Sequence, residues 1–576
     1  MKNLFNLWYF LDNKDKNFFI LIVCFSLFQG ILEMLSIAII IPFVTILLNP
    51  EGLMDIPFIS NLINIDSFEL NQKTIIISCI ILFSIFLIKN ILILFTNKFT
   101  FKFIFNLRTK IFYKLTDKII HQEYLFFVNK SISEIYNVTI NELNNFISNI
   151  ARPTITLVGE IIVFFGILIL IILTGYFDAL LLIFPIVIVI ALILKKLSQS
   201  IKSWSERRIK SYEDLLDLNQ NYVSGIKEIF IYGVAKKILT KFDNILDTLA
   251  SIDTKNTIVT TYPKILLEQS IILIFSTIII FLYYIGNNPN ETIVILSFYL
   301  AVAYRLVPSL NKIFISYQQI KYGRPSADRI FEYYNLIKQN EYLENESKES
   351  NILDFKKKIE LKNIDFKYNN NKSVIENLNL SINKNEIIGF FGESGSGKST
   401  LINIITNLIK PSKGEILIDN QKVDNLKLIR KYQNLFSISS QDTFIIGSTI
   451  KDNILFGSKK EFSQSKMDTA IKFAQLQNFI KELPDGLDTE IGLAVKQLSS
   501  GQKQRITIAR TIYNDREIMI FDEATNALDE VNEKKIFENI KNLRLNKTII
   551  IISHNKKNLE ICDKKFLIEN KVLKLI

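Results

Sequence analysis

The sequence is poor in the residues that build disulfide frameworks and metal centres. It has three cysteines, Cys24, Cys79 and Cys562, which stand far apart without paired spacing, and only two histidines. Neither a disulfide framework nor a cysteine–histidine metal site is therefore predicted. One histidine, His121, has no motif around it, and we expect it at the surface. The N-terminus does not show the pattern of a cleavable signal peptide.

The chain also lacks a basic stripe interleaved with aromatic residues in a soluble region, so its net charge of +11 does not predict a nucleic-acid partner. Hydrophobic residues make up 49% of the 576 residues. They concentrate before about residue 320, whereas charged residues crowd the C-terminal part. From this distribution we interpret the first part as membrane-embedded and the last part as cytosolic. The positive net charge then has an ordinary explanation, because membrane proteins carry excess Lys and Arg on cytoplasmic loops.

Several apolar segments approach or exceed the length of about 20 residues that a helix needs to cross a bilayer. Six spans are predicted: Phe18–Leu48, Ile75–Phe95, Pro153–Thr174, Phe177–Leu194, Ile265–Ile285 and Thr292–Ile315. The long polar segments after the second and fourth spans are rich in Lys and Arg, and the opposite loops are acidic. The positive-inside rule places both long loops and the C-terminal part in the cytoplasm.

A phosphate-binding loop of the form G-x-x-x-x-G-K-[ST] follows an apolar predicted strand, Glu386–Phe391. Its glycines let backbone N–H groups approach phosphate oxygens, and the next helix points its positive end at them. Lys398 should reach the β- and γ-phosphates of ATP, and the Ser399 hydroxyl should hold Mg²⁺. The predicted ATP-binding residues here are Gly392, Glu393, Ser394, Gly395, Ser396, Gly397, Lys398, Ser399 and Thr400.

A second apolar strand, Ile518–Phe521, ends in two acidic residues, Asp522 and Glu523. This is the Walker B arrangement, in which the aspartate holds the Mg²⁺ shell. Glu523 is predicted to polarise the water that attacks the nucleotide.

About a hundred residues after the phosphate loop, the string Leu498-Ser499-Ser500-Gly501-Gln502 resembles the signature sequence of ABC (ATP-binding-cassette) ATPases. The resemblance implies that ATP is sandwiched between the phosphate loop of one copy and the signature of a second copy. Because this chain carries one cassette, two equivalent sites in a homodimer are expected.

The resemblance to ABC ATPases also assigns roles to single residues. It implies that Tyr368 stacks on adenine, that Gln441 senses Mg²⁺ and water, and that His554 contacts the γ-phosphate. Other ATP-site residues implied by the signature and by the D-loop after the Walker B strand are Ser499, Gly501, Gln502 and Asp529.

Two departures from the family pattern stand near the signature. Ser500 replaces the usual glycine, which keeps a small residue, so we expect a working site. The stretch Gly492–Val495 lacks the Glu-x-Gly of many exporters, which puts one contact between subunits in doubt without affecting ATP binding.

Over its whole length the chain resembles an ABC exporter half-transporter. The resemblance implies a multidomain membrane protein, with a six-helix α-helical transmembrane domain (1–337), a linker (338–358) and an α/β P-loop ABC ATPase domain (359–576). In that family each long loop ends in a short coupling helix, for which Ser131–Asn137 and Ser224–Tyr232 are candidates. The alternative for both segments is ordinary helical loop.

Ionisable residues inside predicted spans are costly and are therefore functional candidates. Lys89, Lys264 and Arg305 would form a cationic cavity suited to a phosphate or pyrophosphate group if they faced inward. The alternative is that they snorkel or pair with acids in or beside the spans, namely Glu33, Glu160 and Glu268.

The first span, through Leu32–Phe43, and the outer loop Asn49–Lys73 together resemble the lipid-linked oligosaccharide flippases of bacterial protein N-glycosylation. In that family the outer loop forms a small external helix, for which Pro57–Ile63 is a candidate. This resemblance implies a polyprenyl-pyrophosphate glycan as substrate and the bacterial inner membrane as location.

Three other functions compete with the flippase hypothesis. The chain could export another lipid, a peptide or a drug. It could also be a membrane-anchored ABC ATPase that senses or assembles without moving a substrate. An importer is disfavoured, because importers usually keep their membrane and ATPase parts on separate chains.

Overall fold

The structure is a computed structural model that describes residues 8–39, 43, 72–173, 178–285, 289–335, 353–368, 373–458, 461–491 and 498–576. The chain divides into two units. The helical unit comprises Met1–Gln122 and Asn129–Gln339, and the α/β unit comprises Glu123–Val128 and Asn340–Ile576. The predicted external helix Pro57–Ile63, the stretch Gly492–Val495 and most of the predicted linker lie outside the described residues.

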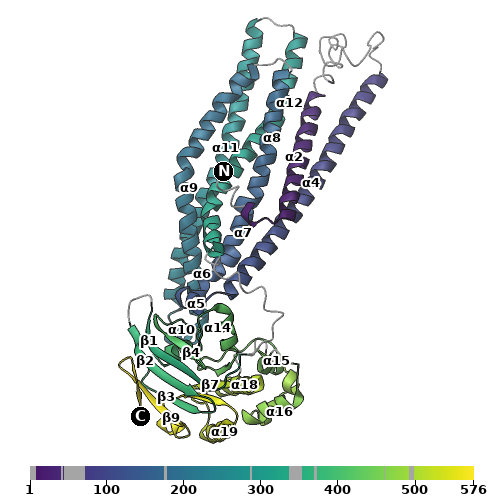
Figure 1. The fold of residues 1–576 in the computed structure, drawn as a ribbon. Coiled ribbons are helices and arrows are strands. Elements are labelled where there is room, and N and C mark those ends of the chain that lie inside the picture. The colour runs from purple at the N-terminus through teal and green to yellow at the C-terminus, as the bar shows by residue number, and fades with distance from the viewer. Residues whose placement is uncertain are drawn as a thin grey trace. The chain divides into compact units, whose positions relative to one another are not determined.

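Long helices build the helical unit (Figure 1). They are α2 (Asn13–Ala38), α4 (Gln72–Ile120), α8 (Arg152–Leu173), α9 (Asp178–Ser224), α11 (Ala235–Ile285) and α12 (Pro289–Asn335). Helices are the expected form for these apolar runs, because a lipid environment leaves backbone polar groups no partner outside their own segment. With 49 residues, α4 extends about 74 Å, far beyond the thickness of a bilayer.

Four stretches of the described helices are long and apolar enough to cross a membrane: Asn13–Ser36, Ile76–Ile120, Ile132–Ile172 and Ala235–Thr277. They overlap the predicted first, second, third and fifth spans, with different bounds. The other two predicted spans lie mostly in α9 and α12, and the total of six spans stays a prediction.

The helical unit is held together around α8, which packs against α2 and α12, while α9 packs against α11 and α12. Apolar side chains of α8 and α12, among them Ile167, Ile171 and Leu306, form a buried cluster. Helix α4 instead leaves large apolar side chains such as Phe83 and Leu94 exposed along its length. An exposed apolar helix surface of this kind suits lipid contact.

Helix α8 continues a segment in which α- and π-helical turns alternate. The segment runs through α6 (Ile132–Tyr136), η2 (Asn137–Glu142), α7 (Leu143–Phe146) and η3 (Ile147–Ala151). The η2 turn buries two polar side chains, Asn137 and Glu142. Single π-helical turns inside α-helices frequently accompany functional sites.

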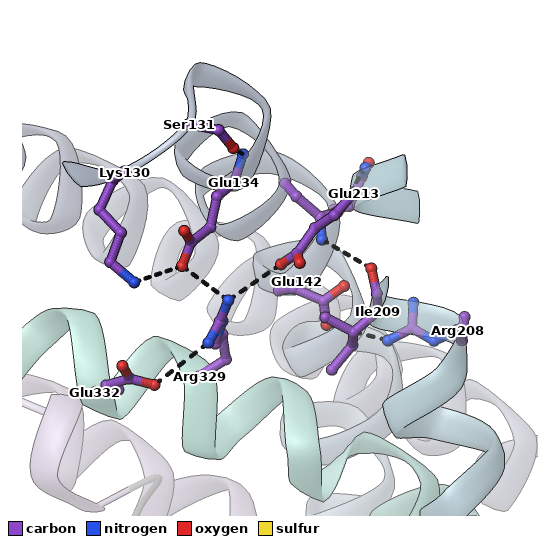
Figure 2. Close-up of polar contacts among 11 residues, drawn as sticks. Lys130, Ser131, Glu134, Glu142, Arg208, Ile209, Glu213, Arg329 and Glu332 are labelled. Atoms are coloured by element: carbon purple, nitrogen blue, oxygen red, sulfur yellow. Dashed lines mark hydrogen bonds and ion pairs between the residues drawn. The ribbon is translucent and has the colours of Figure 1, made fainter. Parts of the chain in front are cut away.

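Charged side chains join α6, α9 and α12 (Figure 2). Arg329 of α12 donates from Nη2 to Glu134 Oε1 at 2.8 Å and to Glu213 Oε1 at 3.2 Å. Lys130 Nζ reaches the same Glu134 oxygen at 2.7 Å, and Glu332 lies 3.6 Å from Arg329 Nη1. One guanidinium therefore connects three helices that are far apart in the sequence.

A second ion pair, between Arg208 and Glu142, lies beside this network (Figure 2). Arg208 Nη2 lies 3.0 Å from Glu142 Oε2 and 3.0 Å from Ser326 Oγ, and the Arg208 and Glu142 side chains are 4% and 0% exposed. The guanidinium also lies over the ring of Tyr322. Neither charge has access to water, so each depends on the other for compensation.

Two sheets build the α/β unit (Figure 1). The four-stranded antiparallel sheet has the order β2-β1-β4-β5, with β1 (Lys358–Lys367), β2 (Ser373–Asn383), β4 (Lys413–Ile418) and β5 (Gln421–Lys422). The six-stranded sheet has the order β10-β9-β3-β8-β7-β6, with β3 (Ile387–Phe391), β6 (Phe436–Ser439), β7 (Ile518–Asp522), β8 (Thr548–Ile552), β9 (Lys564–Glu569) and β10 (Val572–Leu575).

The central strands of the six-stranded sheet run parallel and are buried on both faces, as their continuous apolar sequences require. In register, Ile388 of β3 pairs with Ile550 of β8, which pairs with Ile520 of β7. Parallel strands end at one common edge. The segments that leave β3, β6, β7 and β8 therefore begin side by side.

The described α-helices that follow β3 in the α/β unit are α13 (Lys398–Ile405), α14 (Leu426–Gln433), α15 (Ile450–Leu455), α16 (Gln464–Phe473), α17 (Gln477–Glu482), α18 (Ser500–Asn514) and α19 (Glu530–Leu543). Helix α13 follows β3, and α19 follows β7 after a short loop.

A short segment from the first long loop groups with the α/β unit. Helix α5 (Tyr124–Asn129) places Leu125 against the hydrophobic core of that unit, and Glu123 pairs with Lys410 at 2.9 Å. The predicted first coupling segment, Ser131–Asn137, instead forms α6 and the start of η2 in the helical unit, where Glu134 is fastened to Arg329. The predicted second segment forms the short helix α10 (Ile226–Tyr232).

The buried ion pair gives a direct test of packing in the helical unit. Replacing Arg208 by alanine should lower stability by about 3–5 kcal/mol, because the Glu142 carboxylate would remain buried without a partner. The midpoint of thermal unfolding in detergent measures this loss. The control is Lys202→Ala, which breaks an exposed pair with Glu206 and should change the midpoint little.

An unchanged midpoint in Arg208→Ala would contradict the assignment. Replacing both partners with apolar residues, Arg208→Met with Glu142→Leu, should cost less than Arg208→Ala alone, since no charge is then left unpaired.

Candidate functional site

The phosphate loop connects β3 to α13, and its lysine is held by the loop itself. Lys398 Nζ donates to the carbonyl oxygens of Gly392 and Glu393, each at 2.8 Å. Burial lowers the pKa of Lys398, while the nearby carboxylates of Glu523 and Asp522 favour its charged form. The ammonium group is thus kept at the mouth of the loop, next to the ends of β3 and β7.

The backbone of the loop requires its glycines. Gly395 and Gly397 have φ angles of +80° and +102°, which L side chains rarely adopt. A side chain at Gly392 would place its Cβ 2.8 Å from the carbonyl oxygen of Ile568. The Ser396 hydroxyl is buried and has no hydrogen-bond partner among the described residues, so it is available to a phosphate oxygen.

The predicted adenine-stacking residue lies at the phosphate loop. Tyr368 follows β1, and its hydroxyl is 3.2 Å from Thr400 Oγ1 in α13. Its ring meets Phe366 edge-on, with 4.9 Å between centroids. The four-stranded sheet therefore brings an aromatic face beside the helix that begins at Lys398.

The Walker B glutamate is fixed through both carboxylate oxygens. Its Oε1 lies 2.7 Å from Nε2 of His554, which follows β8, and its Oε2 accepts from Asn526 Nδ2 at 2.8 Å. The Glu523 side chain is 5% exposed, and its φ angle of +49° is uncommon for a residue other than glycine. Backbone strain of this kind clusters at active sites.

The neighbouring Asp522 is suited to a hard cation. Burial raises the pKa of Asp522 to about 6, and the Glu523 carboxylate adds to the rise. A divalent cation would compensate this pair of acids. Asp522, the Ser399 hydroxyl and the Gln441 carbonyl offer oxygen donors of the kind that Mg²⁺ prefers, so the residues present fit that ion.

The signature string caps α18. Gln502 N donates to Ser499 Oγ at 3.1 Å, and Ser499 N donates to Gln502 Oε1 at 2.9 Å, which is a reciprocal capping box. The Ser499 hydroxyl accepts in this cap and keeps its proton for another acceptor. Among the described contacts, none joins Ser499 to the phosphate loop of its own chain.

The structure leaves room for a side chain at Ser500, where the family signature usually has a glycine. Ser500 is exposed at the first position of α18. Gly501 is different, because a Cβ there would lie 2.8 Å from the carbonyl oxygen of Ala527. The tight position is therefore the second one, where this chain keeps its glycine.

Two residues at the site, Gln504 and Asn526, were not predicted from the sequence. Gln504 is buried, accepts from Ala527 N at 3.0 Å and donates to the Glu523 carbonyl oxygen at 3.4 Å. It thereby ties the signature helix to the Walker B segment. Its signal was a polar residue on the buried face of α18, three residues before Thr507. The contact of Asn526 with Glu523 had no signal in the sequence.

Among the charged residues in predicted spans, Arg305 is paired as the alternative interpretation foresaw. Its guanidinium forms an ion pair with Glu33, which is 2% exposed, and Nη2 lies 3.7 Å from Glu160 Oε2. Lys312 Nζ reaches Glu160 Oε1 at 2.7 Å and remains 49% exposed. Lys89 lies within electrostatic reach of Glu33 and Arg305.

Lys264 stands apart from this intramembrane cluster (Glu33, Lys89, Glu160, Arg305 and Lys312). It pairs with Glu268 of the same helix at 3.8 Å, and both side chains are exposed. Of the three predicted cations, Lys89 and Arg305 therefore lie near each other, and Lys264 does not join them.

Two family profiles match the chain. The profile described as the ABC transporter transmembrane region matches residues 18–302, and the profile described as ABC transporter matches residues 375–526. Together they cover about three-quarters of the chain. The chain belongs to the ABC transporters and has the form of an exporter half-transporter, with a helical transmembrane region followed by an α/β nucleotide-binding domain.

Two curated relatives illustrate the match. The heterocyst differentiation ATP-binding protein HepA of Nostoc is 37% identical over 214 residues, which are 37% of this chain and 35% of HepA. ABC transporter B family member 29 (chloroplastic) of Arabidopsis thaliana is 33% identical over 298 residues, which are 50% of this chain and 45% of that protein. The match spans less than half the length of each relative.

A solved structure shares the fold over nearly the whole chain. It is a bacterial Atm1-family ABC exporter with ATP bound, with a TM-score of 0.79 and 18% sequence identity, and the match covers 98% of this chain and 95% of that one. The relatives agree with membership of the ABC transporters, and the solved structure shows that the fold is shared with an ABC exporter. They give no support to the closer resemblance to lipid-linked oligosaccharide flippases.

The signature geometry predicts opposite outcomes at two adjacent positions. Gly501→Ala should lower kcat for ATP hydrolysis, because the added methyl group would push α18 away from the loop at Ala527, at a cost of about 1–3 kcal/mol in stability. Ser500→Gly, at the exposed position, should leave kcat nearly unchanged. Steady-state ATPase assays and thermal unfolding of both variants provide the test, and equal effects of the two changes would contradict it.

Proposed function

We propose that the protein is an ATP-driven exporter that works as a homodimer in the bacterial inner membrane, with the α/β unit in the cytoplasm. The observation that carries this proposal is the convergence of Lys398, Asp522, Glu523 and His554 at one edge of the six-stranded sheet. A phosphate-binding lysine, a Mg²⁺ ligand and a general base are the parts that hydrolysis of ATP requires.

In the proposed cycle, Lys398 leaves the carbonyl oxygens of its loop and binds the β- and γ-phosphates of ATP. Tyr368 stacks on the adenine, and the Ser396 hydroxyl donates to a phosphate oxygen. Bound Mg²⁺, held by Ser399, Asp522 and Gln441, would neutralise developing charge on the phosphates. Glu523 takes a proton from the water as the water oxygen bonds to the γ-phosphorus and the bond to the departing ADP breaks, and His554 turns from Glu523 toward the γ-phosphate.

A second copy completes the site. The Ser499 hydroxyl, which keeps its proton in the α18 cap, donates to the γ-phosphate bound by the partner chain. Gln502 holds Ser499 in the cap of α18, and Gly501 lies in the first turn of the same helix. Asp529, the other predicted contact residue, caps α19. Closure on two ATP molecules and reopening after hydrolysis would alternate the membrane cavity between the two sides.

The contacts around α5 offer a route for this movement. Helix α5 packs on the core of the α/β unit and ends at Asn129, and Lys130 follows directly. Lys130 forms an ion pair with Glu134. Arg329 of α12 pairs with the same Glu134 and also with Glu213 of α9. A shift of α5 would therefore be passed to three helices of the helical unit.

For the substrate, we propose a lipid-linked oligosaccharide that carries a pyrophosphate group. The intramembrane cluster has three cations, Lys89, Arg305 and Lys312, against two carboxylates, which leaves an excess of positive charge for an anionic ligand. Lys312 is the half-exposed member. The first-span resemblance to oligosaccharide flippases supports the same substrate class.

The alternative is export of another lipid, a peptide or a drug. An apolar hollow of about 540 Å³ lies between α11 and α12, lined by residues that include Phe275, Ile279, Tyr304 and Val307. A Staphylococcus aureus protein whose name places it in multidrug export is 38% identical over 214 residues, 37% of each chain. An apolar substrate would use such a surface without need of the cluster.

The Walker B assignment is tested by Glu523→Gln. This variant keeps the shape of the side chain but removes the base, so kcat for ATP hydrolysis should fall by more than about 100-fold while ATP still binds. Malachite-green phosphate release and binding of a fluorescent ATP analogue measure the two properties. Turnover near that of the native protein would overturn the role of Glu523.

The function itself is tested by ATP-dependent movement of a polyprenyl-pyrophosphate glycan in proteoliposomes, with Glu523→Gln as control. Movement by the native protein that is lost in the variant would support the flippase. ATP hydrolysis without movement of this glycan would reject the substrate, and an apolar drug or phospholipid moved instead would favour the alternative.

The intramembrane cluster predicts which cations matter. Arg305→Ala should abolish substrate-stimulated ATPase activity, but it also leaves Glu33 buried and unpaired. Lys312→Ala is the sharper variant, because it keeps the pair of Arg305 with Glu33 and should still reduce stimulation. Lys264→Ala should have a smaller effect. Unchanged stimulation in both Arg305→Ala and Lys312→Ala would exclude an anionic ligand at this cluster.

A further inference from the structure

An acidic residue outside the phosphate site joins the two loops that carry Glu523 and His554. Glu533 lies in the first turn of α19, which is capped by Asp529: Asn532 N donates to Asp529 Oδ2 at 3.2 Å. The Glu533 side chain is half-buried, and its backbone N–H donates to the Asp529 carbonyl oxygen at 2.9 Å. The helix cap therefore fixes the backbone position from which the Glu533 side chain extends.

One oxygen of Glu533 accepts two hydrogen bonds from different loops. Thr525 Oγ1 donates to Glu533 Oε1 at 3.0 Å, and Asn558 Nδ2 donates to the same oxygen at 2.9 Å. Thr525 stands two residues after Glu523, and Asn558 stands four residues after His554. The segment that leaves β7 and the segment that leaves β8 are thus both hydrogen-bonded to Glu533 Oε1.

Further hydrogen bonds fix Ser553, the residue that precedes His554. Asn558 Nδ2 also lies 3.4 Å from the hydroxyl of Ser553, a buried residue that accepts from Asn555 N at 3.0 Å. Ser553 immediately precedes His554. The imidazole is therefore held between two anchored positions, and the 2.7 Å contact between its Nε2 and Glu523 Oε1 depends on both loops keeping this register.

A general electrostatic role at the start of α19 does not account for these contacts. An acid in the first turn of a helix gains about 0.3–1 kcal/mol from the helix dipole wherever its side chain points. Glu530, exposed in the same turn, serves that role equally well. Of these two acids, Glu533 is the one whose side chain accepts hydrogen bonds from both the segment that leaves β7 and the segment that leaves β8.

We propose that Glu533 is a positioning residue for ATP hydrolysis, which sets the Glu523 carboxylate and the His554 imidazole in their relative places. The proposal rests on the hydrolytic function proposed above. Glu533 does not touch the nucleotide site directly. It acts through Thr525 on the segment of the base and through Asn558 on the segment of the histidine.

The first test compares Glu533→Ala, Glu533→Gln and the matched control Glu530→Ala in the purified full-length protein. Glu533→Ala should lower kcat for ATP hydrolysis by about tenfold or more with KM for ATP unchanged, because the base is displaced while the ATP-binding residues stay in place. Glu533→Gln should restore most of the activity, since its amide oxygen still accepts both hydrogen bonds. Glu530→Ala should behave as the native protein.

The second test is a double-mutant cycle with His554→Ala. If Glu533 acts by placing the imidazole against Glu523, the effect of Glu533→Ala on kcat should shrink strongly once His554 is absent. Thermal unfolding of each variant is measured alongside, and Glu533→Ala should lower kcat even at temperatures where it is fully folded.

Three results would overturn the proposal: equal losses in Glu533→Ala and Glu533→Gln, equal losses in Glu533→Ala and Glu530→Ala, or independent effects of Glu533→Ala and His554→Ala. Failure of the hydrolytic function itself is distinguishable. In that case the native protein would not hydrolyse ATP, or Glu523→Gln would hydrolyse it as fast as the native protein.

Discussion

The register between β7 and β8 is the constraint on which the catalytic arrangement depends. Asp522, the last residue of β7, pairs with Ile552, the last residue of β8, so that the chain leaves both strands at the same level. Glu523 and His554 follow, and their side chains meet at 2.7 Å. If β7 slipped by one residue against β8, Asp522 and Glu523 would each point to the other face of the sheet. Apolar burial of these strands therefore specifies the geometry of the polar site at their ends.

The helical unit depends on charge pairing in the same way that the α/β unit depends on strand register. The pair of Arg208 with Glu142 and the network of Arg329 connect helices that are distant in the sequence. Inside the predicted spans, Arg305 is neutralised by Glu33. Ion pairs removed from water are expensive to break, so they fix particular helix arrangements and make these positions suited to transmit movement as a unit.

The sequence was sufficient for features that lie within one short stretch. The phosphate loop with Lys398 and the acids after β7 follow from local patterns. The class of protein came from the resemblance of the signature string Leu498–Gln502, and of the whole layout of spans and cassette, to ABC exporters. The sequence was not sufficient for partners that are distant in the chain. The contact of Glu533 with Asn558 joins residues whose spacing has no period. The pair of Arg305 with Glu33 was foreseen only as one of several alternatives, because the sequence does not show which acid lies opposite the arginine. The position of α5 was missed for a related reason, since a short helix that packs through Leu125 shows no pattern different from ordinary loop.

The central claim is that two copies of this chain close on ATP, with the signature of one facing the phosphate loop of the other. The most direct measurement is the structure of the Glu523→Gln variant with Mg²⁺ and ATP by electron cryomicroscopy. The account predicts two nucleotides per dimer, each with Lys398 of one chain and Ser499 of its partner on the γ-phosphate, and with His554 turned from residue 523 toward that phosphate. ATP bound by a single chain, with Ser499 remote from any phosphate, would contradict it.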